Sequence, residues 1–358
     1  MDITEYMAKN GHEQLVLCVD KEVGLRAIIA IHDTTLGPAL GPPRMAPFTS
    51  DEEAILEALR FSRAKTYKHA AAGLPFGGGR ISVRGDPTKE QSEALVRSLG
   101  RFIESLRGRY IISGGGAGFT DADTEILQLE TKYVMGLPAL LGGSGDPAIF
   151  TGYGVFQGMK ACAKEVFGSD SLKEKTVAIQ GLGKVGSALA KNLKEERSRI
   201  IVSDIRKEAV DFASKEFGAE IVDLDAIYTV ESDIFSPCAW AGILNSKTIA
   251  QLKCKIVAGS ANNQLLDEEK HSQELKQRQI LYAPDYVINA GGVINLQSEM
   301  GGYKPELAKV RTKQISQTLE KIFSIARVRN ITTLEAADRL AEDRIQQARR
   351  VKKIYIDS

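Results

Sequence analysis

Regular alternation of two kinds of segment in the second half of the chain constrains its fold most strongly. From Thr176 onward, short apolar runs of strand character alternate with amphipathic helical ones, starting with TVAIQG, SALAKNLKEE, RIIVSD and EAVDFASKEFG and ending at ILYAPDYVIN. Strands that alternate with helices in this way pair in parallel, because each helix carries the chain back across the sheet. The sequence therefore predicts an α/β domain built on a parallel sheet.

The first of these strands ends in a glycine-rich turn. Gly181, Gly183 and Gly186 in VAIQGLGKVG have the spacing G-x-G-x-x-G, directly after an apolar run and at the start of a helical one. In that context the first glycine permits a tight turn, the second lets a pyrophosphate reach the backbone, and the third lets helix and strand pack closely. A tight turn without a ligand is the alternative. The motif favours a Rossmann domain that binds a dinucleotide.

A carboxylate follows at the distance that such a domain requires. Asp204 ends the next apolar run, RIIVSD, roughly 20 residues after the motif, where an acidic side chain binds the adenosine ribose. Its charge repels a 2′-phosphate and so favours NAD over NADP, whereas Arg206, two residues later, favours NADP. We predict NAD as the cofactor.

Other cofactor contacts are expected beyond the carboxyl ends of the strands, which read SPCAW, GSANNQ and NAGGVIN. Asn262 and Asn289 offer amide groups to a ribose or carboxamide, although each taken singly is also a common turn residue. Gly291 and Gly292 allow close approach. The predicted cofactor contacts are Gly181, Leu182, Gly183, Lys184, Val185, Gly186, Asp204, Thr151, Cys238, Ala239, Asn262 and Asn289.

Composition restricts the class of ligand. A chain of 358 residues with 43% hydrophobic residues accommodates two globular domains. The formal net charge of +1 provides no positive field for nucleic acid or acidic lipid, so a small neutral or zwitterionic ligand fits better. The four cysteines are scattered and form no C-x-x-C pair, so we expect reduced thiols and no metal site. No leader or membrane span is recognisable, and we expect a cytoplasmic protein.

The first half contains a second glycine-rich stretch, GLPFGGGR, which ends at Arg80. It follows a helix predicted from about Asp51 to His69, whose start is indicated by the S-x-x-E pattern of Ser50 and Glu53. Three consecutive glycines predict that a ligand approaches the bare backbone. Arg80 then offers a fixed fork of donors to an anion, or else pairs with a carboxylate such as Asp121 or Asp123.

Five stretches, AIIAIHDTTLGPALG, TYKHAAAG, FGGG, GSANNQL and APDYVINAGGVIN, resemble the leucine, phenylalanine and valine dehydrogenases of the Glu/Leu/Phe/Val dehydrogenase family, the leucine enzymes in particular. The resemblance covers nearly the whole chain. It implies an N-terminal α/β substrate and oligomerisation domain over residues 1–148, a Rossmann domain over 149–331, and a C-terminal helix within 332–358 that returns to the first domain. It also implies a homo-oligomer, either a dimer or an octamer.

The chain departs from the family pattern where the chemistry takes place. In the family the glycine run ends in a catalytic lysine, and here that residue is Arg80. A catalytic aspartate is expected in a stretch resembling YITAEDVG, but this chain reads YIISGGGAG, with Gly115 or Gly116 in its place. The lysine that resembles the family's carboxylate binder, Lys68, is retained, and Lys65 replaces what is usually a methionine.

Two further differences concern the substrate and the strand ends. The family's GPALGG becomes GPALGPP, and Pro42 removes a backbone N–H that could contact a substrate carboxylate. Trp240 stands where the family tends to carry a smaller apolar residue. The predicted substrate contacts are Leu40, Gly41, Lys68, Gly77, Gly78 and Val293.

These replacements predict severely impaired oxidative deamination. Attack of water on the iminium needs a group that exchanges protons near neutral pH, which a guanidinium does not do, and each lost acid–base group costs about 10²–10⁴-fold. Lys65, Lys68 and His69 can face one side of their helix, and two neighbouring ammonium groups lower each other's pKa. The alternative is that Lys65 and His69 are solvated or pack at the helix end.

The sequence therefore predicts an NAD-dependent oxidoreductase that acts on a C=N bond of an amino-acid-derived compound, with Lys65, Lys68, His69 and Arg80 as candidate catalytic residues. Two alternatives stay open. One is an NAD-binding pseudoenzyme with a regulatory role. The other is an amino-acid dehydrogenase whose proton carriers have moved to the helix.

Overall fold

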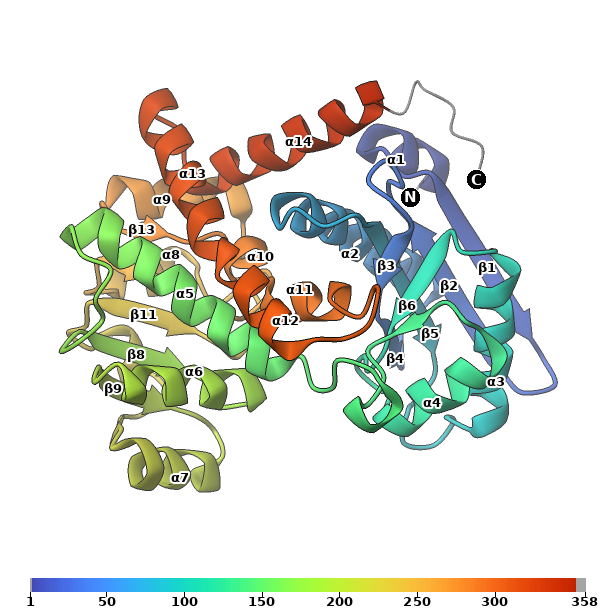
Figure 1. Cartoon of the computed structure of the whole chain (residues 1–358), viewed down its shortest axis with the longest axis horizontal. Coiled ribbons are helices and arrows are strands. Elements are labelled where there is room, and N and C mark those ends of the chain that lie inside the picture. Colours follow the sequence, from blue (N-terminus) through green and yellow to red (C-terminus); the bar gives the residue numbers. More distant parts are fainter. Residues whose placement is uncertain (1, 352–358) are drawn as a thin grey trace. The chain divides into compact units, whose positions relative to one another are not determined.

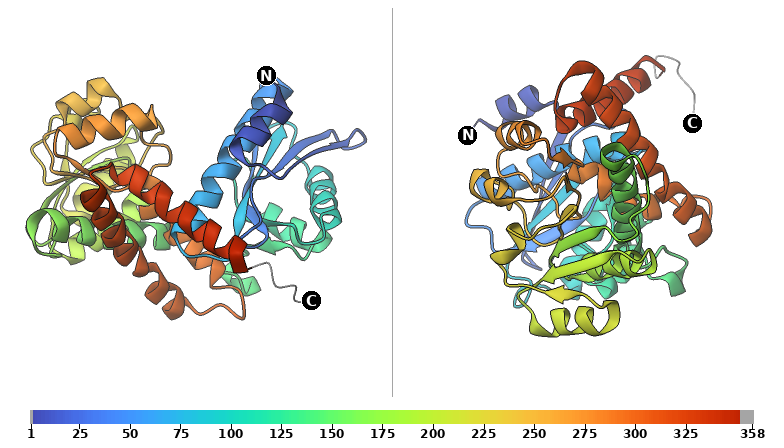
Figure 2. Two further views of the ribbon diagram at one scale, coloured as in Figure 1. Left: turned by 90° about the horizontal axis from the view of Figure 1, so that it is seen from above. Right: turned by 90° about the vertical axis from the view of Figure 1, so that its left-hand side faces the viewer.

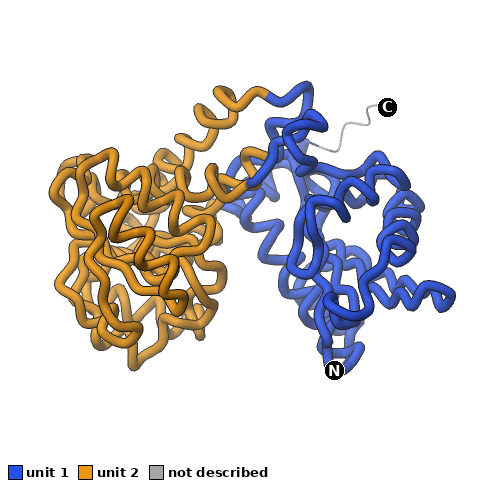
Figure 3. The backbone as a smooth tube through the Cα atoms, turned by 90° about the horizontal axis from the view of Figure 1, so that it is seen from below, with its two compact units in different colours: residues 1–146, 296–303, 341–358 blue, residues 147–295, 304–340 orange. Residues whose placement is uncertain are grey.

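The computed structural model describes residues 2–351 and divides into two compact units. Unit 1 comprises residues 1–146, 296–303 and 341–358, and unit 2 comprises 147–295 and 304–340 (Figure 3). The first division lies two residues before the predicted one. The last lies inside the C-terminal helix, at 340/341 and not at 331/332. The short return of 296–303 to unit 1 has no counterpart in the sequence prediction.

Unit 1 is built on a seven-stranded mixed sheet with the order β1-β2-β5-β3-β6-β7, and β4 also pairs with β5 (Figure 1). β1, β2 and β5 are antiparallel neighbours, and the remaining pairs are parallel. Its elements are α1 (Ile3–Asn10), β1 (Gln14–Asp20), β2 (Leu25–Ile31), β3 (Ala39–Gly41), β4 (Pro43–Ala46), α2 (Asp51–Ala71), β5 (Gly77–Arg84), α3 (Glu93–Ser105), β6 (Tyr110–Ser113), α4 (Asp121–Glu130), β7 (Val134–Met135) and the 3₁₀ turn η1 (Ala139–Leu141).

The helix α2 begins where the sequence predicts. The Ser50 hydroxyl accepts a hydrogen bond from the backbone N–H of Glu53 at 3.1 Å, which satisfies one of the free donors of the first turn. Glu53 completes the cap through Thr49, whose N–H donates to Glu53 Oε2 at 2.7 Å. The helix continues to Ala71, two residues beyond the predicted end, and packs along β5. That packing fixes the glycine run against the helix.

Unit 2 contains a six-stranded, fully parallel sheet with the order β10-β9-β8-β11-β12-β13. Counted along the chain this is the order 3-2-1-4-5-6, which is the classical arrangement for dinucleotide-binding sheets. The predicted parallel α/β domain is thus confirmed, with helices on both faces of its sheet (Figures 1 and 2).

The elements of unit 2 are α5 (Ala148–Phe167), β8 (Thr176–Gln180), α6 (Lys184–Glu195), β9 (Arg199–Ser203), α7 (Lys207–Phe217), β10 (Glu220–Ile221), the 3₁₀ turn η2 (Ala226–Tyr228), β11 (Ile234–Pro237), α8 (Ser246–Gln251), β12 (Ile256–Val257), α9 (Glu268–Gln277), β13 (Leu281–Tyr282), α10 (Asp285–Ile288), α12 (Pro305–Thr312) and α13 (Gln314–Arg329). Two helices cross the division between the units, α11 (Gly291–Gln297) and α14 (Thr333–Val351).

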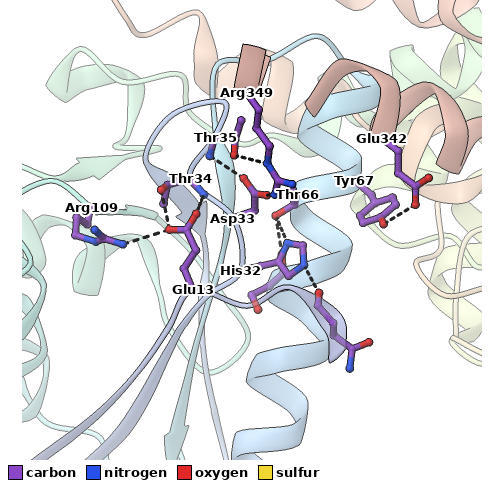
Figure 4. A network of polar contacts seen from close by, with 12 residues as sticks. Glu13, His32, Asp33, Thr34, Thr35, Thr66, Tyr67, Arg109, Glu342 and Arg349 are labelled. Atoms are coloured by element: carbon purple, nitrogen blue, oxygen red, sulfur yellow. Dashed lines mark hydrogen bonds and ion pairs between the residues drawn. The ribbon is translucent and has the colours of Figure 1, made fainter. Parts of the chain in front are cut away.

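The last part of α14 is bonded to unit 1, as the family resemblance implies (Figure 4). Arg349 Nη2 donates to Asp33 Oδ2 at 2.6 Å, and the Tyr67 hydroxyl donates to Glu342 Oε1 at 3.0 Å. Asp33 is 4% exposed, so its negative charge depends on this arginine and on the N–H of Thr35, 2.7 Å from Oδ1. The helix end is therefore tied to α2 and to the segment after β2.

Among residues 2–351 no three His, Cys, Asp or Glu side chains gather as metal ligands, and no helix has the length and apolar character needed to cross a bilayer. The four cysteines are free thiols, of which only Cys238 is not buried.

Candidate active site and cofactor pocket

The turn between β8 and α6 uses its three glycines in three ways. Gly181 has φ +97°, a conformation that side chains other than glycine's rarely adopt. Gly183 borders open space, since a Cβ there would meet no atom within 4 Å. A Cβ on Gly186 would lie 2.1 Å from the Gly181 carbonyl oxygen, so only glycine lets the helix approach the strand this closely. The turn leaves its backbone open at Gly183.

Asp204 lies beside this turn at the end of β9. Its Oδ2 accepts from the N–H of Leu182 at 2.6 Å, and its Oδ1 accepts from the N–H of Arg206 at 2.8 Å and from Arg206 Nε at 3.2 Å. Burial raises the pKa of Asp204, but the hydrogen bonds from Leu182 and Arg206 outweigh it and leave the pKa below its ordinary value. The group is thus a carboxylate at neutral pH.

A pocket of about 420 Å³ opens at the carboxyl ends of β8, β9 and β11. Five predicted cofactor contacts line it: Gly181, Gly183, Asp204, Cys238 and Ala239. Two buried oxygens in its wall, Gln180 Oε1 and Ser203 Oγ, have no hydrogen-bond partner among the described residues. Such atoms fit a ligand that supplies hydroxyl or amine donors. The remaining lining residues, which sequence reasoning did not assign to the cofactor, are Gln180, Ser203, Ile205, Arg206, Leu224, Asp225, Tyr228 and Trp240.

The remaining predicted cofactor residues lie at other places in unit 2. Asn289 is buried, and its Nδ2 donates to Asn262 Oδ1 at 2.9 Å, so the two asparagines meet. Thr151 lies on α5, where its hydroxyl donates to the carbonyl oxygen of Pro147, the residue before the helix. Gly291 and Gly292 were expected to admit a ligand, but their faces are filled by α5: a Cβ on Gly291 would lie 1.9 Å from the Phe150 carbonyl oxygen. Leu182, Lys184, Val185 and Gly186 belong to the glycine turn and the first turn of α6, and Val293 is 8% exposed within α11.

The glycine run at the start of β5 is explained by the protein's own packing. A Cβ on Gly77 would lie 2.0 Å from the Asp33 carbonyl oxygen, and one on Gly78 would lie 2.1 Å from that of Ser62 in α2. One on Gly79 would lie 2.4 Å from the ring of Tyr110. Neighbouring backbone and ring atoms thus fill the side-chain faces of these glycines, and the approach of a ligand to their backbone stays a prediction.

Gly41 and Leu40, also predicted to contact substrate, lie in β3 beside this run. A Cβ on Gly41 would lie 1.8 Å from the Gly79 carbonyl oxygen, and the Tyr110 hydroxyl donates to Gly41 O at 2.9 Å. Leu40 is 1% exposed and belongs to the interior of unit 1. Both residues thus have structural roles in the sheet.

Arg80 is buried and paired with a carboxylate that the sequence did not suggest. Its Nη2 lies 2.6 Å from Glu57 Oε1, and its Nε lies 3.2 and 3.3 Å from the two oxygens of Glu57. Ser82 also donates to this carboxylate, and Arg44 Nη1 lies 3.4 Å from it. The guanidinium carbon of Arg80 lies 4.7 Å from the centroid of Phe61. Asp121 and Asp123 are not its partners.

Two side chains of α2, Lys65 and His69, have strongly lowered pKa values. Burial, the neighbouring Lys68 and Arg80 together lower the pKa of Lys65 to about 7. Burial, with the charge of Lys65 adding, lowers the pKa of His69 to about 3, so its ring is neutral. His69 Nδ1 lies 2.8 Å from the Gly77 carbonyl oxygen and therefore donates to it. Lys68 is 9% exposed.

The loop after β6 leaves little room for a carboxylate. A Cβ on Gly116 would lie 1.6 Å from the Pro43 carbonyl oxygen, and one on Gly114 would lie 2.5 Å from Thr124 Cγ2. Gly115 has φ +64°, and a Cβ there would have only Asp121 Oδ1 nearby, at 4.0 Å. Of the two positions that the family pattern suggests for the aspartate, only Gly115 has space for a side chain.

Comparison with known protein families decides the relationship. The Glu/Leu/Phe/Val dehydrogenase dimerisation-domain model matches residues 12–133, and the Glutamate/Leucine/Phenylalanine/Valine dehydrogenase model matches residues 142–206 and 202–353. The chain belongs to the Glu/Leu/Phe/Val dehydrogenase family. This confirms the resemblance drawn from the five sequence stretches, and with it an NAD-dependent oxidoreductase of the amino-acid dehydrogenase class.

Individual members of the family are similar over almost their whole length. Leucine dehydrogenase of Thermoactinomyces intermedius is 53% identical over 99% of this chain and 97% of that protein. Phenylalanine dehydrogenase of Lysinibacillus sphaericus is 48% identical over 94% of this chain and 89% of that protein. The crystal structure of L-tryptophan dehydrogenase from Nostoc punctiforme superimposes with a TM-score of 0.85, at 44% identity, over 97% of this chain and 99% of that one.

Proposed function

We propose that this family member catalyses hydride transfer to or from a C=N bond of an amino-acid-derived substrate, without hydrolysis of the imine. Two observations together carry the proposal: Arg80 is held by Glu57, and the loop at Gly114 to Gly116 carries no carboxylate. Neither position can exchange a proton near neutral pH, whereas the glycine turn and Asp204 are arranged for the cofactor. NAD(H), when bound, supplies or accepts the hydride.

Lys65 is the proposed proton donor. A C=N bond accepts hydride more readily once its nitrogen is protonated, and an ammonium group with a pKa of about 7 gives up its proton near neutrality. His69 is excluded from this role because its ring is neutral and its Nδ1–H is bonded to Gly77. Arg80 is excluded because it is bound by Glu57, so we assign the substrate carboxylate to Lys68.

The same lysine supports a second candidate function, an amino-acid dehydrogenase with a relocated proton carrier. Lys65 could activate water as a neutral amine, replacing the lysine that the family carries at the position of Arg80. We rank it second because deamination also calls for a second proton carrier, and residues 114–116 supply none. For either function we propose a cytoplasmic homo-oligomer, a dimer or an octamer, that takes part in a biosynthetic pathway.

NADH oxidation measured against two substrate panels tests the proposal. One panel contains preformed cyclic imines that bear a carboxylate, and the other contains 2-oxo acids with ammonia. We expect turnover of at least one imine, with a loss of about 10²–10⁴-fold in kcat for Lys65→Met and a raised KM for Lys68→Ala. Lys9→Met, on an exposed position of α1, is the matched control and should leave both unchanged.

The possible results separate the candidates. If 2-oxo acids with ammonia are turned over as fast as any imine, the dehydrogenase function replaces the proposed one. If neither panel is turned over while NADH still binds, the chain is a cofactor-binding pseudoenzyme. If Lys65→Met retains the full rate on an active imine, the assignment of the proton donor is wrong.

A further inference from the structure

The side chain of Arg206 lies in the wall of the pocket, directly beside Asp204, the carboxylate that we expect to bind the ribose. Its Nη2 donates to the Leu182 carbonyl oxygen at 2.9 Å and lies 3.4 Å from Asp204 Oδ2, and its Nε lies 3.2 Å from Asp204 Oδ1. Nη1 has no hydrogen-bond partner in the described part of the chain. Since the side chain is 56% exposed, it can turn without disturbing the interior.

In this arrangement the charge of Asp204 alone does not exclude NADP from the pocket. Exclusion rests on an uncompensated negative charge where a 2′-phosphate would lie. Here the charge of Asp204 is balanced by Arg206, and both of its oxygens already accept hydrogen bonds from the chain. A second carboxylate, that of Asp225, also lines the pocket, so the net charge of its three ionised side chains is −1.

We propose that Arg206 forms a 2′-phosphate subsite, so that the chain binds NADP(H) as a second dinucleotide beside NAD(H). Asp204 keeps its bond to the Leu182 N–H, while the guanidinium turns from Asp204 to the phosphate and donates in its planar fork. When NAD(H) binds instead, no 2′-phosphate is present, and the ribose diol contacts Asp204. Asp204 and Asp225 still oppose a second negative charge, so NAD(H) remains the tighter ligand.

The chain provides its own reporter for the test. Trp240 is the only tryptophan in the sequence, it lines the same pocket, and it is 68% exposed. Quenching of its fluorescence therefore follows occupancy of this pocket by NADH, NADPH or a fragment. Adenosine 2′,5′-bisphosphate and 5′-AMP differ only in the 2′-phosphate, and titrating both isolates the subsite without any turnover, so the result does not depend on the C=N chemistry proposed above.

Arg206→Asn is the decisive variant, with Lys207→Asn as its matched control. Lys207 is the next residue, but it is 81% exposed, pairs with Asp211 at 2.8 Å and does not line the pocket. We expect wild type to bind NADPH about 10–100-fold more weakly than NADH. Arg206→Asn should weaken NADPH and the bisphosphate by a further factor of about 10–100, the value of charge-assisted hydrogen bonds. NADH and 5′-AMP should change by less than about 3-fold, and Lys207→Asn should change none of them.

Two results would overturn the proposal. One is that wild type shows no NADPH quenching at a hundred times the concentration that half-saturates with NADH. The other is that Arg206→Asn weakens NADH and NADPH by the same factor, which would make Arg206 a structural partner of Asp204 and nothing more. Unchanged thermal unfolding of the variant shows that the fold is intact in either case.

Discussion

At the scale of single residues, the charge balance around Glu57 determines what the α2 face can do. Its carboxylate contacts Arg80, Ser82 and Arg44, and no hydrogen bond or ion pair joins it to Lys65 among the described residues. Lys65 is half-buried beside Lys68 and Arg80, and the described residues give it no carboxylate partner. An ammonium group in such surroundings loses its proton more easily than in water.

The first prediction concerns Lys65 and stability. Its pKa is about 7 in the folded chain and near 10.4 when unfolded. Between these values the unfolded state binds the proton and the folded state does not, so stability rises with pH through this window, and the full penalty applies below pH 7. We expect Lys65→Met to stabilise the chain at pH 6 by about 1–2 kcal/mol after screening by solvent.

Urea unfolding of the variant and of wild type at pH 6, 8 and 9.5 measures this effect. The gain from Lys65→Met should shrink at each step, whereas Lys9→Met should show no such trend. A gain that is equal at all three pH values would mean that the folded pKa of Lys65 is not depressed.

The second prediction concerns the pair of Glu57 and Arg80. Removal of Arg80 leaves a carboxylate largely buried without its main partner, while removal of Glu57 leaves a buried guanidinium, and losses of this kind cost about 3–5 kcal/mol. We expect Arg80→Met and Glu57→Gln to lower the free energy of unfolding by about that amount, and the double variant to lose less than the sum of the two. Strictly additive losses in this double-mutant cycle would show that the pair does not interact.

At the scale of elements, the two glycine-rich stretches are similar in sequence but have different structural roles. In the turn between β8 and α6, Gly183 faces open space. At the start of β5, all three glycines face protein atoms closer than a Cβ tolerates. The first stretch leaves room for a ligand, and the second brings β5 against α2 and Tyr110.

The third prediction tests this contrast. Gly183→Ala meets no atom within 4 Å in the protein, so the melting temperature should change little, but the added methyl group stands where the pyrophosphate must approach. We expect at least a 10-fold rise in the Kd for NADH, measured by Trp240 fluorescence. Gly186→Ala is the comparison: its Cβ would lie 2.1 Å from Gly181 O, and we expect it to damage folding itself. Normal NADH affinity in Gly183→Ala would refute the assignment of the turn.

Sequence reasoning succeeded for unit 2 because its signals are local. The strand and helix alternation, the motif spacing and the position of Asp204 all follow from neighbouring residues, and each is found as predicted. It failed for Arg80 because its partner, Glu57, lies 23 residues earlier on a helix whose register against β5 no local pattern specifies. The packing of Gly77 to Gly79 was missed for the same reason, since Asp33, Ser62 and Tyr110 meet only in the folded unit.

At the scale of the whole molecule, the proposed function combines a family member's architecture with an altered proton-transfer apparatus. It is 53% identical to a leucine dehydrogenase across 99% of its length, yet the two departures occur in separate elements, β5 and the loop after β6. By the family pattern, each departure replaces a residue that exchanges protons, and the sheet of unit 1 still forms. Loss of two complementary groups with retention of the cofactor turn is the pattern expected when the cofactor chemistry is kept and hydrolysis is not.

The last prediction follows from that combination. We expect leucine, valine and phenylalanine to be oxidised far below the usual enzyme range of about 1–10³ s⁻¹. Arg80→Lys alone should restore little, because Glu57 would hold the new ammonium group in its charged form and the second proton carrier would still be absent. Recovery should require Arg80→Lys, Glu57→Gln and Gly115→Asp together, since position 115 has space for a side chain and aspartate tolerates its positive φ.

Gly116→Asp in the same background is the matched control, because the Pro43 carbonyl oxygen occupies the position of its Cβ. Initial rates of NADH formation with the three amino acids decide the outcome. A rise of about 10²-fold or more in the rate, seen with the substitution at 115 and not at 116, would show that hydrolysis depends on the groups missing from β5 and from the loop after β6. Rapid oxidation of leucine by the unaltered chain would instead show that Lys65 already performs both proton transfers, and the second candidate function would stand.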